Sequence, residues 1–199
     1  MSFDSEIPTH GYTELLSLSE ARKSCRRFLP DPVSEADINR ILKIASTAPF
    51  ASGRKNWEVL VVDSPSVREA MAQAVSEEVE AMSGRMDDDL ARLFGQYAKN
   101  FRLFREAPLL LIPVFRIAPT MKAMLRNHMT PEIALWERDN AVQSISCVTM
   151  MILLAAQSLG LGACYMTGPL LAHDRLAEVL HLPPERRIGA VVPVGRPFV

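Results

Sequence analysis

The stretch NAVQSISCVTMMILLAAQSLGLGACYMTGPLLA, from Asn140 to Ala172, contains no Asp, Glu, Lys, Arg or His. An apolar segment of about 20 residues can span a bilayer, so this stretch raises the question of a transmembrane helix. Polar side chains such as Gln143 and Ser144 interrupt it, and the glycines and proline after Leu159 divide it into shorter pieces. We therefore predict a buried helix followed by a buried strand in a globular protein.

The helix that contains the first part of this stretch begins upstream, at Thr130-Pro131-Glu132. Threonine is a favoured N-cap residue, proline suits the first turn, and an acid interacts favourably with the positive end of the helix dipole. We expect the helix to run to about Leu159, because Gly160 follows it. Beyond it we predict a strand over 162–166, a short helix over 174–180 and a final strand over 188–194.

The N-terminal part of the sequence predicts further helices and one strand. Ser34 is placed as an N-cap, with Asp37 three residues later in a capping-box position, and this helix should end before Pro49. The run WEVLVV at 57–62 is rich in β-branched residues and predicts a strand. Further helices are expected over 12–23 and, after Ser64-Pro65, to about residue 82.

The middle of the chain has a different pattern. From Met86 to Phe104 apolar residues recur at three- and four-residue steps, which predicts an amphipathic helix. The run LLLIPVF at 109–115 suits a central strand, although Pro113 implies an edge or a bulge near its end. Residues 116–129 have no clear period and predict a loop. Together the elements favour a layered α+β fold, formed by one domain over 1–199.

The overall composition excludes several classes of function. The chain has 22 Lys and Arg residues and 23 Asp and Glu residues, a net charge of −1, which argues against nucleic acid or an anionic membrane as a partner. The first residues carry acids and no long apolar run, so no signal peptide and a cytoplasmic location are expected. Cys25, Cys147 and Cys164 have no CxxC spacing and predict reduced thiols rather than a disulfide or zinc framework.

Several strong catalytic motifs are absent from the sequence. It contains no GxxxxGK[ST] phosphate loop, no HExxH motif and no GxSxG elbow, and Gly160-Leu161-Gly162 lacks the third glycine of a dinucleotide fingerprint. The four histidines stand far apart, so solvated or capping roles are expected for them. The sequence therefore predicts neither a metal site nor classical NAD binding.

The segment Arg22-Lys23-Ser24-Cys25-Arg26-Arg27-Phe28 places four cations and a hydroxyl within six positions, at the expected end of the first helix. Guanidinium groups bind phosphate in a bidentate manner and a hydroxyl adds a directional hydrogen bond, so the segment could hold a phosphate group. Basic residues at a helix C-terminus also complement the helix dipole, which gives a purely structural alternative. Both interpretations remain open on the residues alone.

This segment, followed by Pro32-Val33-Ser34, resembles the opening signature of the FMN-dependent nitroreductase family. The segment APFASGRKNW at 48–57 is similar to a second motif of that family, which is followed by a strand, as at 58–62 here. The resemblance continues in order with APLLLI at 107–112, LAAQSLGLGAC at 154–164, LP at 182–183 and VPVGRP at 192–197. The ordered set covers most of the chain and is specific.

The resemblance implies an α+β fold with a central, mainly antiparallel sheet flanked by helices, and an intertwined homodimer with FMN at the subunit interface. Contacts with the FMN phosphate, ribityl chain and pyrimidine edge are implied for Arg22, Lys23, Ser24 and Arg26. Contacts with the flavin of the partner chain are implied for Phe50, Ala51 and Ser52. The turn expected against the flavin ring is Tyr165, Met166, Thr167 and Gly168.

The activity implied by the resemblance is hydride transfer from NAD(P)H through the flavin to a small oxidant such as a nitro-aromatic compound or a quinone. No side chain needs to act as a nucleophile, and we expect Arg26 to stabilise the negative charge of the reduced flavin. Alternatives within the fold are dehalogenation, enone reduction or dehydrogenation. A further alternative is a flavin-binding or flavin-free protein with an interaction role.

The sequence departs from the family pattern in its second motif and near its end. Gly53-Arg54-Lys55-Asn56 lacks the Asn, Gln and Pro of that motif, which affects the expected pyrimidine contacts. Many relatives carry further basic residues that bind phosphate after the position of Gly195, so either Arg196 substitutes for them or Arg22 and its neighbours suffice. The helical segment at about 83–106 varies in the family and is expected either to cover the flavin or to pack in the core.

Overall fold

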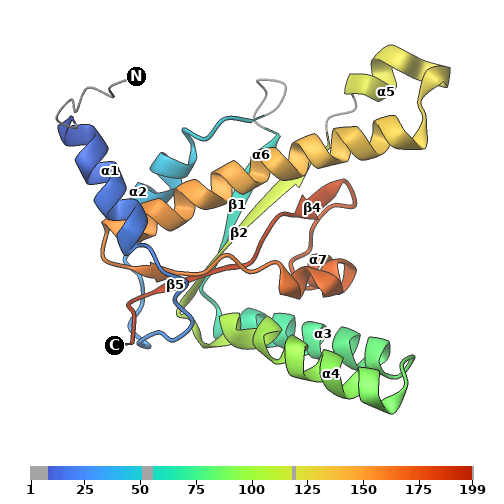
Figure 1. Cartoon of the computed structure of the whole chain (residues 1–199), viewed down its shortest axis with the longest axis horizontal. Coiled ribbons are helices and arrows are strands. Elements are labelled where there is room, and N and C mark those ends of the chain that lie inside the picture. The colour runs from blue at the N-terminus through green and yellow to red at the C-terminus, as the bar shows by residue number, and fades with distance from the viewer. Residues whose placement is uncertain (1–8, 51–55, 118–119, 199) are drawn as a thin grey trace, which may run out of the picture.

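The computed structural model describes residues 9–50, 56–117 and 120–198. At its centre is a sheet whose strands lie in the order β1 (Trp57–Val62), β2 (Leu109–Arg116), β5 (Val192–Gly195) and β3 (Gly162–Ala163), with β4 (Arg186–Ile188) also paired to β2. All of these strand pairings are antiparallel. Helices cover the sheet (Figure 1), which confirms the predicted α+β fold class with a central antiparallel sheet flanked by helices.

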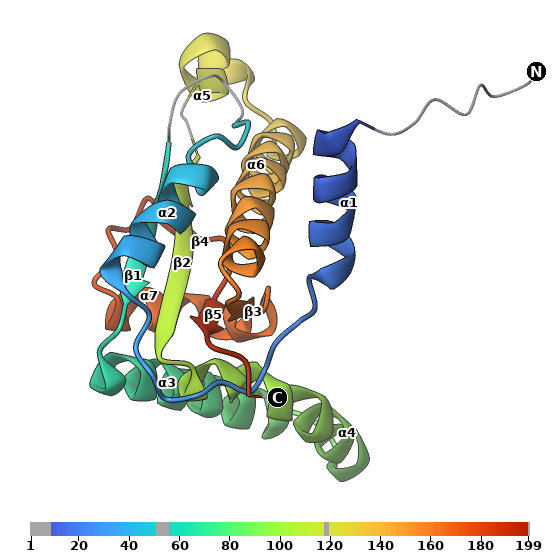
Figure 2. The same cartoon turned by 90° about the vertical axis from the view of Figure 1, so that its left-hand side faces the viewer.

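The two faces of the sheet are covered by different helices. One face packs against α6 (Pro131–Ser158) and α2 (Glu35–Ala45), and α1 (His10–Ala21) lies beside α6 (Figure 2). The other face packs against α3 (Pro65–Ser83), the 3-10 helix η2 (Lys99–Glu106) and α7 (His173–Val179). Side chains of β2 alternate between the faces, so that Leu109 and Leu111 meet the first core and Leu110 and Ile112 the second.

The predicted long helix is α6. The Thr130 hydroxyl accepts a hydrogen bond from the Ile133 amide at 3.3 Å, and the chain turns after the helix at Gly160, where φ is +71°. Its inner side is buried in the first core through residues such as Ile145, Val148 and Ile152. Among the described residues, α6 is the one helix long and apolar enough to cross a membrane. However, 44% of its most apolar 18-residue segment is buried inside the protein. The cytoplasmic location stays a prediction.

The start of α2 follows the predicted capping box. The Ser34 hydroxyl accepts a hydrogen bond from the Asp37 amide at 3.1 Å and donates one to the Asp37 carboxylate at 2.7 Å. The Ser34 hydroxyl, followed by the Arg40 guanidinium, lowers the pKa of the Asp37 carboxyl. The predicted strand 57–62 and the helix after Ser64 are also present, as β1 and α3.

Pro113 lies within the central strand, not at an edge. It is opposite Val59 of β1, and on its other side its carbonyl accepts a hydrogen bond from the Gly189 amide at 2.8 Å. In an antiparallel sheet, the nitrogen and the carbonyl of one residue point toward the same neighbouring strand. The nitrogen of Pro113, which has no hydrogen, therefore points toward Gly189, in the gap between β4 and β5. The strand therefore tolerates proline because its neighbour is interrupted there.

Two predicted strands are shorter than expected, and this is a correction. The strand expected over 162–166 is limited to β3, with an isolated pairing of Met166 with Val191, because Cys164 donates to Pro193 and proline has no N–H to return. The strand expected over 188–194 is divided into β4 and β5 around Gly189. A Cβ on Gly189 would lie 2.8 Å from Ile145, so the backbone passes close to α6 at this point.

The predicted helix from Met86 to Phe104 is divided into α4 (Asp88–Ala98) and η2. The buried residues at this junction are Ala98, Phe104 and Ala107, and the half-buried Phe101 lies between them. Their spacing of three residues matches the three residues per turn of a 3-10 helix rather than the period of an α-helix. The apolar periodicity was sufficient to predict a helix but not its type.

The segment 116–129, which we expected to be a loop, contains the short helix α5 (Thr120–Leu125) and a 3-10 turn (Arg126–His128). At the start of α5, the Met121 amide donates to the Glu137 carboxylate of α6 at 3.1 Å. This partner lies far along the chain, so no local pattern could indicate it. Figure 1 shows α5 beyond the sheet, at the N-terminal end of α6.

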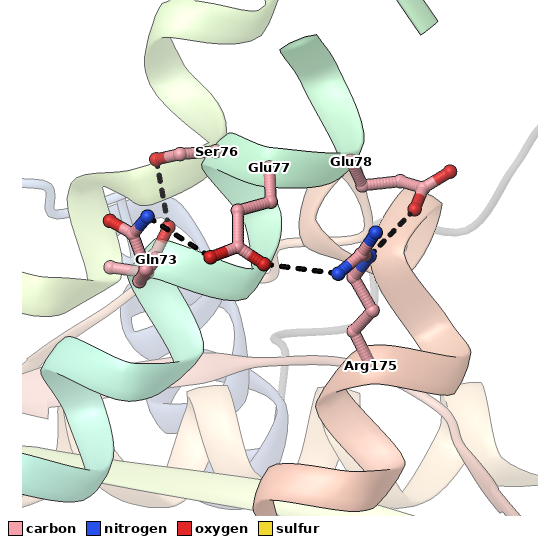
Figure 3. Close-up of polar contacts among 6 residues, drawn as sticks. Gln73, Ser76, Glu77, Glu78 and Arg175 are labelled. Atoms are coloured by element: carbon pink, nitrogen blue, oxygen red, sulfur yellow. Dashed lines mark hydrogen bonds and ion pairs between the residues drawn. The ribbon is translucent and has the colours of Figure 1, made fainter. Parts of the chain in front are cut away.

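Ion pairs close the outer edge of the second face. Arg175 of α7 donates through Nε to Glu78 and through Nη1 to Glu77 of α3, each at 3.0 Å (Figure 3). Gln73 donates to the other oxygen of Glu77 at 3.1 Å. These contacts join α3 to α7, which flanks the turn that the resemblance places against a flavin.

Candidate functional site

The cationic loop, defined as Arg22 to Phe28, lies outside the first helix. α1 ends at Ala21, and Arg22 has an extended backbone with φ −62° and ψ 117°. Ser24 pairs with Ala163 of β3 in parallel orientation, and the Cys25 amide donates to the Ala163 carbonyl at 3.0 Å. The loop thus continues the sheet beyond β3. Arg22 is the C-cap of α1 and so can complement its dipole, whereas Arg26 and Arg27 lie beyond the last turn of the helix, where the dipole has little effect.

The other end of the cationic loop is fixed by the last described residues. Phe28 pairs with Pro197, the Leu29 amide donates to the Arg196 carbonyl at 2.9 Å, and the Phe198 amide donates to the Arg27 carbonyl at 3.1 Å. In this pairing Arg196 lies opposite Leu29, and its charge helps to lower the pKa of Asp37 on α2. Arg196 therefore lies on the side of the loop that faces α2.

The cations of the loop are available to a ligand. Lys23, Ser24 and Arg26 are exposed and Arg22 is half-buried, and none of the three cations forms an ion pair with a carboxylate in the described parts of the chain. Guanidinium, ammonium and hydroxyl groups together are a donor set that suits a phosphate. The local charge is concealed by the near-zero net charge of the chain.

Cys164 shows how close these groups are to β3. Burial raises the pKa of the Cys164 thiol, and the Arg26 guanidinium, the Ser24 hydroxyl and the Arg22 guanidinium partly offset this effect. Burial also raises the pKa of the Cys25 thiol. Arg22, Ser24 and Arg26 are therefore gathered around the buried residue that immediately follows β3. Cys164 gave no motif in the sequence, so its place beside the loop could not be predicted.

The turn from Tyr165 to Gly168 follows Cys164 directly. Met166 is held by two hydrogen bonds with the backbone of Val191, at 3.0 and 3.1 Å. The Tyr165 hydroxyl lies 3.0 Å from the Ser146 hydroxyl of α6, whereas Thr167 is exposed. The structure thus brings two groups of predicted site residues, the cationic loop and this turn, to the same strand.

Phe101 of η2 packs directly on the turn. A Cβ on Gly168 would overlap Cδ1 and Cε1 of the Phe101 ring, so this position has no space for a side chain. The Tyr97 ring meets Phe101 edge-on, with centroids 5.2 Å apart, and Tyr97 is 70% exposed. Phe104, three residues after Phe101, is fully buried. The segment is therefore core at its C-terminal end and surface along α4. The apolar stripe in the sequence did not identify Phe101 as a neighbour of this turn.

The third group of predicted site residues lies elsewhere. Phe50 is half-buried, with its ring centroid 6.5 Å from that of Trp57, while Ala51 and Ser52 lie outside the described residues. Trp57 is opposite Phe115 at one end of β2, and Val194 is opposite Leu109 at the other. Six residue steps along a strand cover about 20 Å. Within one chain, Phe50 and the cationic loop thus lie at opposite ends of the sheet.

Phe50 borders a surface groove instead. The groove has a volume of about 330 Å³ and lies between the end of the α2 segment and α6. The described residues that line it are Pro49, Phe50, Asn140, Gln143, Ser144 and Cys147. The side chains from α6 are polar, and they belong to the stretch from Asn140 to Ala172 that has no charged residue.

The chain is similar to several proteins of known class. A model of the Nitroreductase family matches residues 20–196. Iodotyrosine deiodinase of Danio rerio is 28% identical over 189 residues, covering 91% of this chain and 59% of that protein. A crystal structure of a BluB-like flavoprotein from Clostridium difficile 630 has a TM-score of 0.82 at 25% identity, covering 92% of this chain and 90% of that one.

A crystal structure of oxidised iodotyrosine deiodinase, bound to FMN and 3-iodo-L-tyrosine, has a TM-score of 0.68 at 22% identity, covering 92% of this chain and 90% of that one, and shares the fold. The chain spans 59–62% of the length of three iodotyrosine deiodinases that it matches. The family model, in contrast, extends over most of the sequence. On that match, the chain belongs to the nitroreductase family.

Proposed function

We propose that this chain is an FMN-dependent oxidoreductase, folded as one domain, whose cationic loop binds the FMN phosphate. The observation that carries the proposal is the anchoring of Ser24 and Cys25 on β3, which is followed directly by the turn Tyr165 to Gly168. One strand thereby presents both a phosphate-binding donor set and a surface for a ring. The FMN in a structural neighbour of the same fold supports this choice of cofactor.

Each group of residues has a defined task in this proposal. Arg22, Lys23, Ser24 and Arg26 would hold FMN, with donors for its phosphate, its ribityl chain and its pyrimidine edge. When bound, FMN supplies the hydride and electron chemistry that these side chains lack. The Arg26 guanidinium would stabilise negative charge on a bound flavin. Phe101 keeps the turn at Gly168 in place against the ring.

We further propose a homodimer, because one chain does not assemble the whole site. Phe50 lies about 20 Å from the cationic loop along β2, so Phe50 can reach a flavin only if that flavin belongs to a second copy. Large apolar side chains also remain exposed on the surface of α1 and α6, and they include Leu15, Leu135, Trp136 and Met150. A second copy would cover this surface.

The expected reaction transfers hydride from NAD(P)H to the flavin and then passes electrons to a small oxidant, a nitro-aromatic compound or a quinone. NAD(P)H and the oxidant would bind alternately at one open face of the flavin ring, so the chain would need no separate dinucleotide-binding fold.

Reductive dehalogenation is the second candidate function. It is favoured by the 28% identity to an iodotyrosine deiodinase over 91% of this chain. The same flavin site serves both candidates, and they differ in the acceptor that occupies it. A noncatalytic interaction role is an alternative of another class, and it predicts that none of these acceptors reoxidises the reduced protein.

The test is anaerobic reduction of the protein as purified. We expect a yellow protein whose flavin absorption bleaches with NADH or NADPH and returns when a nitro-aromatic compound or a quinone is added. Return of colour only with 3-iodo-L-tyrosine, accompanied by release of iodide, would favour the second candidate. A colourless protein that takes up no added FMN would contradict both candidates.

A further inference from the structure

We propose that His173 is a proton-sensitive tie that holds the proposed flavin turn, Tyr165 to Gly168, against the sheet, so that acid weakens the hold of the protein on FMN. The tie is the hydrogen bond that the His173 ring accepts from β4. The effect on FMN rests on the proposed function, whereas the tie itself is a property of the fold. The inference adds control by pH to the proposed site.

The His173 ring joins the start of α7 to β4. The Ile188 amide donates a hydrogen bond to Nε2 at 3.2 Å, and Nδ1 lies 3.0 Å from the Asp174 carboxylate. A backbone N–H can only donate, so Nε2 must carry a lone pair, and Nδ1 then carries the hydrogen that is donated to Asp174. The contacts therefore require a neutral ring in one defined tautomer.

The sheet offers the Ile188 amide no partner in place of this ring. The next amide, that of Gly189, donates to β2 at Pro113, and successive N–H groups of a strand point to opposite sides. The Ile188 amide therefore points away from β2, toward α7. Ile188 is only 4% exposed, so water does not readily replace the ring. A protonated Nε2 is a donor and cannot accept, which leaves a buried N–H group without a partner.

The segment that carries the flavin turn is tied to the sheet at two points. The turn continues into the 3-10 helix η4 (Gly168–Ala172), and His173 follows directly. Near the start of the segment, Met166 forms two backbone hydrogen bonds with Val191, at 3.0 and 3.1 Å. These backbone bonds do not titrate, whereas the bond at His173 does. Protonation of His173 therefore releases one end of the segment and leaves the other in place.

Most charged groups near His173 already have partners. The helix that begins at His173 packs on α3, η4 and β4, and η4 contains no charged residue. The ion pairs of the other elements are those of Glu77 and Glu78 with Arg175 (Figure 3), and of Arg186 with Glu58. These groups are engaged with one another, so they do not replace the bond to the Ile188 amide.

Asp174 and Arg187 act in opposite directions on a protonated His173 ring. The Asp174 carboxylate would attract it, but this side chain is 92% exposed and solvent screens the attraction. The hydrogen bond from His173 and, to a lesser extent, the charge of Arg187 lower the pKa of the Asp174 carboxyl. Arg187 is therefore close enough to repel a protonated ring. Loss of the bond to Ile188 is the effect that these two charges leave uncompensated.

The first test measures the tie by urea unfolding at pH 7.5 and pH 5.5, between which histidines usually titrate, with excess FMN present. In His173→Gln the side-chain oxygen can still accept a hydrogen bond but does not titrate. We expect the unfolding equilibrium constant to rise on acidification about 3- to 10-fold more in wild type than in His173→Gln, the loss of one hydrogen bond. The control His128→Gln, which replaces an exposed histidine, should behave as wild type.

A variant without an acceptor separates loss of the bond from other effects of acid. His173→Leu should unfold about 3- to 10-fold more readily than wild type already at pH 7.5. Its response to acid should be as small as that of His173→Gln. Equal responses of wild type and His173→Gln would overturn the inference and leave the proposed function intact.

The second test measures the dissociation constant of FMN at the same two pH values. The FMN phosphate itself titrates near pH 6, but this change is common to all variants. We expect the increase on acidification to be about 2- to 10-fold larger in wild type than in His173→Gln, the limit being the loss of the tie. An equal increase in both proteins would overturn the link between the tie and the flavin turn. A wild-type protein that binds no FMN at either pH would contradict the proposed function, and the unfolding experiment would still test the tie.

Discussion

The two faces of the sheet differ in how completely the chain covers them. On the face of α3 and α7, Phe104 and Leu176 are fully buried, and Arg175 joins the helices by ion pairs. On the face of α6, the inner side of the helix is buried but Leu135 and Trp136 on its outer side are 49% and 57% exposed. We call the face of α3, η2 and α7 the complete face, because the helices that pack on the sheet there are joined within the chain, although α4 outside them exposes Leu93 and Tyr97. The face of α6 is the incomplete face, where we propose a second copy.

The largest expected effect is on the complete face. Phe104→Ala should lower the free energy of unfolding by about 3–5 kcal/mol, because it leaves a cavity in a core that is fully packed. Urea unfolding measures this change. The control Leu93→Ala removes a side chain that is 56% exposed on α4 and should change the free energy of unfolding by less than about 1 kcal/mol. Equal effects of the two substitutions would show that η2 is not part of the core.

The second largest effect is expected on the incomplete face, and it concerns the dissociation constant of the proposed dimer rather than the free energy of unfolding. Trp136→Ala should weaken the proposed dimer by about 2 kcal/mol, roughly 30-fold in the dissociation constant, since exposed tryptophans are frequent interface anchors. Sedimentation equilibrium measures the constant. Tyr97→Ala, which removes an exposed aromatic ring from the other face, should leave it unchanged. A wild-type monomer with bound flavin would contradict the distinction between the faces.

A smaller effect is expected where the complete face meets the proposed flavin turn. Gly168→Ala places a methyl group against the Phe101 ring and should cost about 1–3 kcal/mol of stability through overpacking. Because the two residues are in contact, combining it with Phe101→Leu should recover part of that loss. The free energies of unfolding of the single and double variants test this coupling, and strict additivity would contradict the contact.

The smallest effect concerns the ion pairs at the outer edge of α3 and α7. Arg175→Ala should cost only about 0.2–1 kcal/mol, because the charges are partly exposed and screened by salt. The loss should diminish as the salt concentration rises, which thermal unfolding at low and high salt can measure. A larger loss that does not depend on salt would mean that Arg175 acts through packing of its side chain.

Local signals in the sequence were enough to predict many of the elements. The capping residues Ser34 and Thr130 each form the hydrogen bond expected of them, and Gly160 turns the chain after α6 as expected. The starts of α2 and α6 could therefore be predicted from their capping residues. Such signals act over a few residues, which is why they can be read without knowledge of the fold.

The structure differs from the sequence-based expectations where a residue far along the chain determines the local structure. α5 depends on a hydrogen bond from Met121 to Glu137, and β3 is short because Pro193 cannot donate to it. The helix over Lys99–Glu106 adopts a three-residue period because Phe101 must pack on Gly168 and Phe104 in the core. No pattern within a short window of sequence contains these partners.

In the candidate site, too, some features could be predicted from local sequence and others depend on contacts between distant residues. The cationic loop could be predicted as a possible phosphate site from composition alone, and the resemblance to the family linked it to the turn after β3. The groove beside Phe50 could not be predicted, because Asn140 and Gln143 appear in the sequence only as interruptions of an apolar stretch. Their place beside the groove depends on which face of α6 they occupy.

The central claim is that the cationic loop holds the phosphate of FMN. Its most direct test is the amount of FMN retained after gel filtration by wild type, Arg22→Ala and the control Arg85→Ala, which removes an exposed arginine after α3. We expect about one FMN per chain in wild type and control, and a 10- to 100-fold weaker affinity in Arg22→Ala, roughly the loss of one charge-assisted hydrogen bond. Equal retention by all three proteins would contradict the claim.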